Sequence, residues 1–433
     1  MPISPSERVH QTVIERVKPR SNGRYRGDML RSQHDSIRSG AAFVVPEDSR
    51  YTQILPMPTI AVRPVPLLDL RAQFSQIRQE VMEAISGVCE SQELILGPPV
   101  RQFEEAAAAY CSARYAIGCA SGSDALTLAL MAYDIGPGDQ VLTVPFSFFA
   151  TAGSIAQLGA KPVFVDVEPD TFNIDVQKAI QALETNDRIR AVIPVHLYGG
   201  CADMDPLCAA AKNRGIPVIE DAAQSIGAQY CGRSAGSLGE IGCFSFYPTK
   251  NLGAFGEAGM LTTNDSNLAE KLAALRVHGS RQRYFHDWVG INSRIDTLQA
   301  AVLNVKLRYL DQWTAARQTH AKQYQQLFAE RSVAVRVPNP AVYQTRHVYN
   351  QFVIVCDRRD ELRQWLAENQ ISTEIYYPLS LHLQKCFLNL GYREGDFPVS
   401  ESLTRQVLAL PVYPELQPED IEYVVDRIAV FYS

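Results

Sequence analysis

Between Val65 and about residue 310, short apolar runs alternate with longer segments in which apolar residues recur every three or four positions. The short runs predict buried β-strands, and the longer amphipathic segments predict helices. We expect strands at 115–120, 140–144, 162–167, 191–195, 217–219 and 243–247. Helices are expected at 75–89, 99–111, 125–133, 147–158, 206–213 and 267–278, with another that includes 180–183. Near-continuous apolar strands separated by helices are typical of a parallel sheet covered on both faces.

The pattern changes in the last third of the chain. Two stretches, 298–310 and 314–328, predict one or two long helices. Beyond about Arg331 we expect a strand at 351–355, a helix at 360–368, a strand at 372–376 and a last helix near 418–431. The predicted fold class is therefore α/β, with a large domain at 63–312 built on a mostly parallel sheet and a smaller α+β domain at 313–433.

The first 62 residues have a different texture. They are rich in Arg, Ser and Pro and have few periodic apolar positions, which favours a disordered or loosely attached extension. The pattern also fits a short helix at 32–38. An arginine-rich arm or a transit peptide is the alternative, and acidic residues count against both: Glu7, Glu15, Asp28, Asp35, Glu47 and Asp48.

Composition narrows the class of protein. The chain has 433 residues, of which 46% are apolar, and a formal net charge of −6 from interspersed acids and bases. This balance argues against nucleic acid or an anionic membrane as the main partner. Nine irregularly spaced cysteines without a C-x-x-C pair favour reduced thiols over a disulfide framework or a zinc site. No apolar run approaches a membrane span and residues 1–30 lack a signal-peptide core, so we expect a cytoplasmic protein without a metal.

Polar side chains with distinct chemistry follow the ends of the predicted strands. Ser121-Gly122-Ser123-Asp124 stands between a strand and a helix that Ser123 or Asp124 can cap. Free N–H groups and the helix dipole can hold a phosphate there, although an ordinary capped helix start gives the same pattern. Asp221 ends a buried strand, at the edge where such sheets bind ligands, and is equally consistent with a helix cap. A carboxylate there can keep a pyridine nitrogen protonated, and Gln224 could reach an oxygen on the same ring.

Lys250 is the candidate nucleophile. It lies between a predicted strand and a Gly-rich loop in CFSFYPTKNLGAFGEAG (243–259), with apolar, aromatic or small residues on both sides. Most lysines are solvated surface residues. A lysine held here would lose hydration, its pKa would fall, and it would become a usable amine. Such amines form Schiff bases with carbonyl compounds and with pyridoxal phosphate.

Aromatic residues and a histidine fall at the same predicted edge. Phe148 follows a strand end and can stack on a planar cofactor, although core packing is the commoner use of such a ring. His196 and Tyr198-Gly199-Gly200 follow the strand at 191–195. Each feature is weak alone. A phosphate cradle, a stacking ring, a strand-end Asp and a loop Lys at one sheet edge together favour a pyridoxal-phosphate site.

These residues belong to longer motifs that resemble the DegT/DnrJ/StrS family of nucleotide-sugar aminotransferases, which depend on pyridoxal 5′-phosphate (PLP). The motifs cover nearly the whole chain from about Pro66: PLLDLRAQF (66–74), SGSDAL (121–126), GAKPVFVDVEPDTFNID (159–175), PVHLYG (194–199), VIEDAAQSIGA (218–228), GSLGEIGCFSFYPTKNLGAFGEAG (236–259) and NSRIDTLQAAVL (292–303). The resemblance implies the fold type I of PLP-dependent transferases and a homodimer whose active sites are shared between subunits.

The resemblance also implies a role for each matching residue. Lys250 would be the Schiff-base lysine, Asp221 the partner of the pyridine nitrogen, and Gln224 the contact to the ring hydroxyl. The other cofactor contacts would be Gly122, Ser123 and Ser245 at the phosphate, Phe148 on the ring, and Asn292 from the neighbouring subunit. Substrate contacts are expected at His196, Arg281, Arg294, Tyr376 and Tyr377, with Tyr376 standing where many members have His.

The implied activity is transfer of an amino group from L-glutamate to a nucleotide-linked keto-sugar, giving an amino sugar for a surface polysaccharide or glycoside. Some relatives with His in place of the lysine are sugar dehydratases, and Lys250 argues against that chemistry. Two alternatives stay open. One is an aminotransferase for amino acids or other small ketones, and the other is a regulator that keeps the fold without the chemistry.

Overall fold

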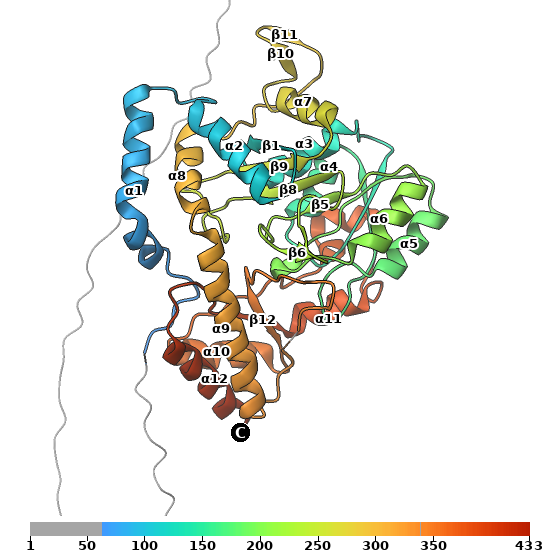
Figure 1. The fold of residues 1–433 in the computed structure, drawn as a ribbon. Helices are drawn as coiled ribbons and strands as arrows, with labels where there is room; N and C mark the ends of the chain where they lie inside the picture. Colours follow the sequence, from blue (N-terminus) through green and yellow to red (C-terminus); the bar gives the residue numbers. More distant parts are fainter. Residues whose placement is uncertain (1–62, 338) are drawn as a thin grey trace, which may run out of the picture. The chain divides into compact units, whose positions relative to one another are not determined.

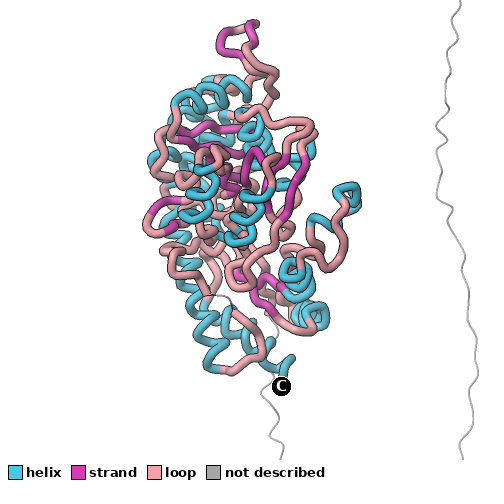
Figure 2. The backbone as a smooth tube through the Cα atoms, turned by 90° about the vertical axis from the view of Figure 1, so that its right-hand side faces the viewer, coloured by secondary structure: helices cyan, strands magenta, loops and turns pink. Residues whose placement is uncertain are grey.

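The computed structural model describes residues 63–337 and 339–433. Figure 1 shows the fold coloured along the sequence, and Figure 2 shows the backbone turned by 90°. The expectations for residues 1–62, including the helix at 32–38, lie outside the described residues.

The centre of the fold is a mainly parallel sheet. Its strands are β1 Tyr115–Cys119, β2 Gln140–Thr143, β3 Lys161–Phe164, β4 Ile189–Val192, β5 Ile219–Asp221, β8 Ile241–Ser245 and β9 Gly259–Thr263. Four of them lie in the order β1-β9-β8-β5, and three lie in the order β3-β2-β4. Parallel bridges from Val192 to Val218 and from Val195 to Asp221 join β4 to β5. β9 runs antiparallel to β1 and β8, while β5 with β8 and β2 with β3 and β4 pair in parallel.

Each predicted strand of this sheet overlaps an observed one, so the mostly parallel sheet is confirmed. β9 was not predicted, because its sequence follows directly on the Gly-rich loop. A Cβ at Gly259 would lie 2.3 Å from the carbonyl oxygen of Ser121, the residue that precedes the helix at Gly122–Ala132. Glycine is therefore needed for β9 to pass this close to Ser121.

Helices pack against the sheet and against one another. They are α1 Leu70–Ser91, α2 Pro98–Tyr110, α3 Gly122–Ala132, α4 Ala150–Gln157, α5 Val176–Thr185, α6 Met204–Asn213, α7 Ser266–Leu275, α8 Thr297–Leu307 and α9 Leu310–Glu330. α3 packs against β8 and β9 and also against α4 and α7, while α2 lies on β1 and α8. All of the predicted helices of this region are present.

Two helix starts differ from prediction for reasons of capping. α1 begins at Leu70 rather than near residue 75, because the Asp69 carboxylate accepts the N–H groups of Arg71 (2.9 Å) and Ala72 (3.0 Å). α3 begins at Gly122, because Ser121 is its N-cap and accepts the N–H of Asp124 at 3.1 Å. The prediction of Ser123 or Asp124 as the cap is therefore wrong.

The C-terminal part contains β12 Phe352–Val355, α10 Arg359–Glu368, α11 Pro398–Gln406, β13 Val407–Leu410 and α12 Pro418–Tyr432. β12 and β13 form an antiparallel pair. Side chains of α9, α10 and α12 bury the pair, and Val65 from the start of the described chain is buried in the same cluster. The domain boundary at residue 312 stays a prediction.

The strand predicted at 372–376 is absent. Isolated bridges occur at its place, between Ile371 and Val65 and between Glu374 and Ala409. The carbonyl of Tyr376 instead accepts the Tyr198 hydroxyl, so the segment is drawn towards the central sheet. β13, which was not predicted, pairs with β12.

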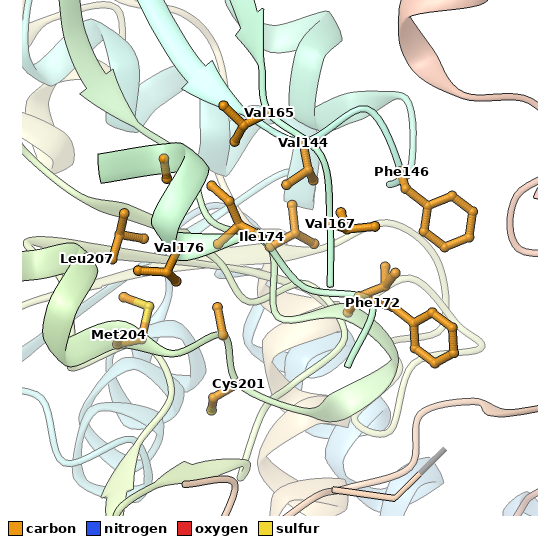
Figure 3. Close-up of a cluster of buried hydrophobic side chains, with 14 of the residues drawn as sticks. Val144, Phe146, Val165, Val167, Phe172, Ile174, Val176, Cys201, Met204 and Leu207 are labelled. Carbon is orange, nitrogen blue, oxygen red and sulfur yellow. The ribbon is translucent and has the colours of Figure 1, made fainter. Parts of the chain in front are cut away.

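A buried apolar cluster supports the loops that follow β2, β3 and β4. Figure 3 shows part of it, where side chains from separate segments converge: Val144, Val165, Val167, Ile174 and Val176. Leu197 and Tyr198 belong to the same cluster. Close packing of this kind holds the strand ends rigidly.

A short hairpin of β10 (Ser280–Gln282) and β11 (Phe285–His286) projects beyond α7 in Figures 1 and 2. At its tip Tyr284 is 79% exposed and Phe285 is 64% exposed. The remaining short elements are β6 Gln229–Tyr230, β7 Arg233–Ser234 and the 3₁₀ turns η1 Leu197–Gly199, η2 Leu381–Leu383 and η3 Lys385–Leu390. In the described part of the chain, no helix combines the length and the apolar character of a membrane span. All nine cysteines are free.

Candidate active site

A cavity of about 600 Å³ opens at the carboxyl ends of the parallel strands, where β1, β2, β4, β5 and β8 lead into loops. Nine residues proposed from the sequence line it: Gly122, Ser123, Phe148, Asp221, Gln224, Ser245, Lys250, Tyr376 and Tyr377. The structure therefore brings together residues that are up to 255 positions apart, from Gly122 to Tyr377.

One wall of the cavity is the first turn of α3. A Cβ at Gly122 would lie 2.6 Å from the Cβ of Ser245, so glycine lets α3 approach β8 this closely. The first N–H groups of a helix have no intrahelical acceptor. The hydroxyl-bearing residues Ser123 and Ser245 line the same cavity. N–H and hydroxyl donors at a helix N-terminus make a site for an anion such as a phosphate.

Lys250 lies on the loop that follows β8. Backbone hydrogen bonds close this loop, from Lys250 N to Tyr247 O and from Ala254 N to Phe246 O, both at 2.8 Å. Burial lowers the pKa of the Lys250 amine to about 8, against the opposing attraction of the Asp221 carboxylate. A useful fraction of this amine is therefore neutral near neutral pH, and the neutral form is the nucleophile.

Asp221 is the last residue of β5 and is 5% exposed. Burial raises the pKa of its carboxyl group. A hydrogen bond from Thr151, one from the Ala223 N–H, and the charge of Lys250 oppose that shift. Asp221 thus combines a buried carboxylate with several groups that favour its charged form.

Thr151 and Ser147 are neighbours of Asp221 that sequence reasoning missed. Thr151, in the first turn of α4, donates its hydroxyl to Asp221 Oδ2 at 2.7 Å, and Ser147 lies 2.9 Å from the Thr151 hydroxyl. No short-range pattern links Thr151 to a partner 70 positions away.

Gln224 is held by two tyrosines. Its Oε1 accepts the backbone N–H of Tyr198 at 2.7 Å, and its Nε2 donates to the Tyr377 hydroxyl at 3.1 Å. Burial raises the pKa of the Tyr377 hydroxyl, so this group stays neutral. The amide therefore links the loop after β4 to the C-terminal segment that enters the cavity.

Phe148 stands at the cavity wall with 56% of its surface exposed. Its ring lies 6.1 Å from the ring of Tyr377, tilted by 42°. An exposed ring in a cavity can cover the face of a planar ligand, whereas a core phenylalanine would be buried.

His196 does not reach the cavity, so the prediction of a substrate contact is wrong. It is 0% exposed, and its Nδ1 accepts the Ala202 N–H at 3.1 Å. Its Nε2 must then carry the proton and donate it to Glu220, 2.9 Å away. The same carboxylate accepts N–H groups from the turn at 236–239. His196 is a structural residue of the buried loop.

Arg281 also lies outside the cavity. It lies on the projecting hairpin, with Glu270 at 3.7 Å, Asp287 at 3.5 Å and its guanidinium over the Trp288 ring at 4.8 Å. Arg294 is half-buried and does not line the cavity.

Asn292 is exposed and likewise lies outside the cavity. Its neighbour Ser293 is fully buried, donates to Asp124 at 2.6 Å and accepts the Ala120 N–H at 3.1 Å. The segment is therefore fixed beside the start of α3, with the Asn292 side chain in solvent.

Other residues line the cavity without having been proposed, among them Tyr247, Thr249, Glu257 and Gln351. The first three stand within the motif around Lys250, which could have indicated them. Gln351 precedes β12, and nothing in its local sequence signals a place in the site.

The sequence matches the DegT/DnrJ/EryC1/StrS aminotransferase family over residues 75–429. The chain belongs to this family. This aminotransferase is 50% identical to a pleiotropic regulatory protein from Geobacillus stearothermophilus, over 85% of the chain and 98% of the relative. It is 43% identical to the UDP-N-acetyl-3-dehydro-alpha-D-glucosamine 3-aminotransferase of Acidithiobacillus ferrooxidans, over 84% of the chain and 97% of the relative.

Among solved structures, the aminotransferase resembles S. venezuelae DesV in complex with a ketimine intermediate. The TM-score is 0.83 at 40% identity, over 86% of this chain and 99% of that one. The family, the fold type I and the enzyme class predicted from the sequence are thus confirmed.

The aminotransferase depends on PLP, as its family does. Its residues fit that cofactor. Three features face one cavity of about 600 Å³: the start of α3 at Gly122 beside Ser245, the buried Asp221 carboxylate and the Lys250 amine. The predicted cofactor is therefore confirmed, and the individual contacts are taken up as proposals.

Proposed function

We propose that this aminotransferase moves an amino group from L-glutamate to a nucleotide-linked keto-sugar, giving an amino sugar for a polysaccharide or glycoside. The observation that carries the proposal is a single cavity holding an amine of lowered pKa, a buried carboxylate and a helix-terminal anion site. The relative that acts on UDP-N-acetyl-3-dehydro-glucosamine supports the substrate class and favours a keto group at C3.

Each lining residue that was predicted from the sequence has a proposed task. PLP supplies a carbonyl carbon that carries the amino group and a ring that spreads negative charge. Ser123, Ser245 and the N–H groups at Gly122 bind the phosphate, and Phe148 covers the ring. Asp221 accepts from the ring nitrogen, and Gln224 contacts the ring hydroxyl. Lys250 would hold the cofactor through its amine, and its Nζ would take up and return the proton that moves between carbon centres. Tyr376 and Tyr377 face the substrate.

The proposal is tested with the holoenzyme, L-glutamate and a panel of UDP- and dTDP-linked 3-keto and 4-keto sugars, with products read by mass spectrometry. We expect amino-sugar formation, fastest with a 3-keto substrate. Free keto acids serve as the comparison. Turnover of those acids without turnover of any nucleotide sugar would instead favour an aminotransferase for small ketones.

A regulator is the second candidate function, because a relative 50% identical to this chain carries a regulatory name. The Lys250 amine and the Asp221 carboxylate in one cavity favour catalysis. A purified protein that shows the absorption band of bound cofactor but no turnover on any panel member would favour the regulator.

We further propose a homodimer in which Asn292 enters the partner's site. The support is its exposed side chain on a segment anchored beside α3, together with the family resemblance. A side-chain amide can donate to a phosphate oxygen and add one anchor to the N–H groups. Substrate contacts by Arg281 or Arg294 would also require the partner, because neither lines its own cavity.

Asn292→Ala is expected to weaken cofactor retention by about 1.5–3 kcal/mol, the usual worth of a hydrogen bond to a charged group. The measurement is subunit mixing. Lys250→Ala subunits and Asn292→Ala subunits, each poorly active at limiting cofactor, are combined under conditions that allow exchange. In a mixed dimer with shared sites, one site carries both defects and the other carries neither, so activity should reappear.

Mixing each variant with itself is the control for handling losses. If mixed dimers form and remain no more active than their parents, Asn292 serves its own subunit or none, and the shared site is contradicted.

A further inference from the structure

Two buried hydroxyl groups form a chain that ends on Asp221. The Thr151 hydroxyl donates to Asp221 Oδ2 at 2.7 Å, and the Ser147 hydroxyl lies 2.9 Å from it. Thr151 is 0% exposed and Ser147 is 3% exposed. Because Thr151 uses its single hydrogen on Asp221, Ser147 must donate to Thr151. The chain of hydrogen bonds therefore has one direction, and it ends on the carboxylate.

We propose that Thr151 is a positioning residue that keeps the Asp221 carboxylate charged and fixed for the ring nitrogen of the cofactor. The inference rests on the proposed role of Asp221. Asp221 and Ser147 line the cavity, whereas Thr151 does not. Thr151 therefore acts through Asp221 and makes no contact with the cofactor itself.

The two oxygens of Asp221 are held from different elements. Oδ2 is bound by Thr151 in the first turn of α4, and Oδ1 receives the Ala223 N–H in the turn after β5, at a longer 3.3 Å. A carboxylate fixed at both ends cannot rotate freely. The weaker bond to Oδ1 leaves that oxygen with capacity for a donor from the cavity.

Charged and titratable groups surround this carboxylate. The Lys250 ammonium, from the loop after β8, favours its negative form, and His196, from the loop after β4, also lies near it. Tyr377 from the C-terminal segment and Cys243 of β8 also lie near it, and burial, together with the charge of Asp221, raises the pKa of both groups. Burial works against the negative form, and the Thr151 hydroxyl is the first of the groups that oppose burial. Without that hydroxyl, Asp221 would take a proton more readily and would hold a protonated ring nitrogen less well.

Thr151→Val tests the proposal, because valine keeps the shape of threonine and removes the hydroxyl. Thr151→Ser is the matched variant that restores it. Two ligands are titrated calorimetrically into cofactor-free protein: pyridoxine 5′-phosphate, which has no aldehyde to react with Lys250, and its analogue with a ring carbon in place of the nitrogen. A ligand pair that differs at one atom separates an effect on the ring nitrogen from a general loss of packing.

We expect Thr151→Val to weaken binding of pyridoxine 5′-phosphate by about 10- to 100-fold, the usual effect of losing a hydrogen bond to a buried charge. Binding of the carbon analogue should change by less than about 2-fold, since it offers Asp221 no nitrogen. Thr151→Ser should bind both ligands nearly as the parent protein does.

Equal weakening of both ligands by Thr151→Val, or no weakening of either, would overturn the role of Thr151. Asp221→Asn in the same titration separates this inference from the proposed function beneath it. If Asp221→Asn loses the preference for the nitrogen ligand and Thr151→Val keeps it, the inference about Thr151 alone is overturned. If Asp221→Asn keeps that preference, the assignment of Asp221 is overturned as well.

Discussion

Replacing Lys250 by alanine is expected to abolish amino transfer while leaving the fold and part of the cofactor binding intact. Lys250 carries the only amine among the described residues that line the cavity, so no neighbour can take its place. Proton transfer by a positioned group is worth about 10²–10⁴-fold in rate, and the bond to the cofactor is lost in addition. The measurement is glutamate-dependent formation of amino sugar, with the folded state checked by circular dichroism.

Two variants and one trapping experiment sharpen this result. Lys250→Arg keeps the positive charge but offers neither a nucleophile nor a base at neutral pH, so it should be as inactive as Lys250→Ala. Lys322→Ala removes an exposed lysine of α9 and should keep full activity. Borohydride reduction of the holoenzyme should leave cofactor on the peptide that contains Lys250, and cofactor on any other lysine would contradict the assignment.

The sequence could predict which residues meet in the site, because all of them lie at or beyond the ends of strands. Asp221 ends a strand, Gly122 and Lys250 lie in segments that follow other strands, and parallel strands end at the same edge of a sheet. Local sequence therefore indicates which residues meet, although they are far apart in the chain. The family resemblance then supplied a role for each.

Other parts of the site depend on contacts that local sequence does not carry. Tyr377 reaches the cavity through its bond to Gln224, which lies 153 positions away. The segment before it read as a strand because Ile375 and its neighbours have high β-propensity, but the tertiary contact of Tyr376 prevailed over that preference. Thr151 escaped notice for the same reason, since it lies on α4 and its partner lies at the end of β5, 70 positions away.

His196 shows the opposite error. Its position after a strand at the functional edge was correctly predicted, but the direction of its side chain was not. Side chains alternate along a strand, so Glu220, immediately before Asp221, points to the other side of β5. His196 forms its hydrogen bond with Glu220 there and therefore points away from the cavity. Two adjacent carboxylates on one strand thus have separate tasks, one structural and one facing the cavity.

Asp221→Asn is expected to lower turnover by about 100-fold or more, because a neutral amide no longer favours a protonated ring nitrogen. Removing one partner from a buried, hydrogen-bonded pair of charges also costs binding free energy. Asp221 is 5% exposed, so water cannot replace the missing charge. The measurement is turnover with L-glutamate at saturating cofactor. Asp221→Glu keeps the charge while lengthening the side chain, and it should retain more activity than Asp221→Asn.

The same substitution should also change the acidity of Lys250, which gives a test on cofactor-free protein. The negative charge of Asp221 stabilises the Lys250 ammonium and raises its pKa, while burial has already brought that pKa down to about 8. Removing the charge must therefore lower the pKa below about 8. The rate at which the amine reacts with an added aldehyde rises with pH through this pKa, so the profile of Asp221→Asn should move to lower pH. Asp221→Glu should leave it nearly in place. A pH profile that does not move would mean that the charge of Asp221 does not affect the pKa of Lys250. Near-normal turnover of Asp221→Asn would mean that the ring nitrogen has another partner.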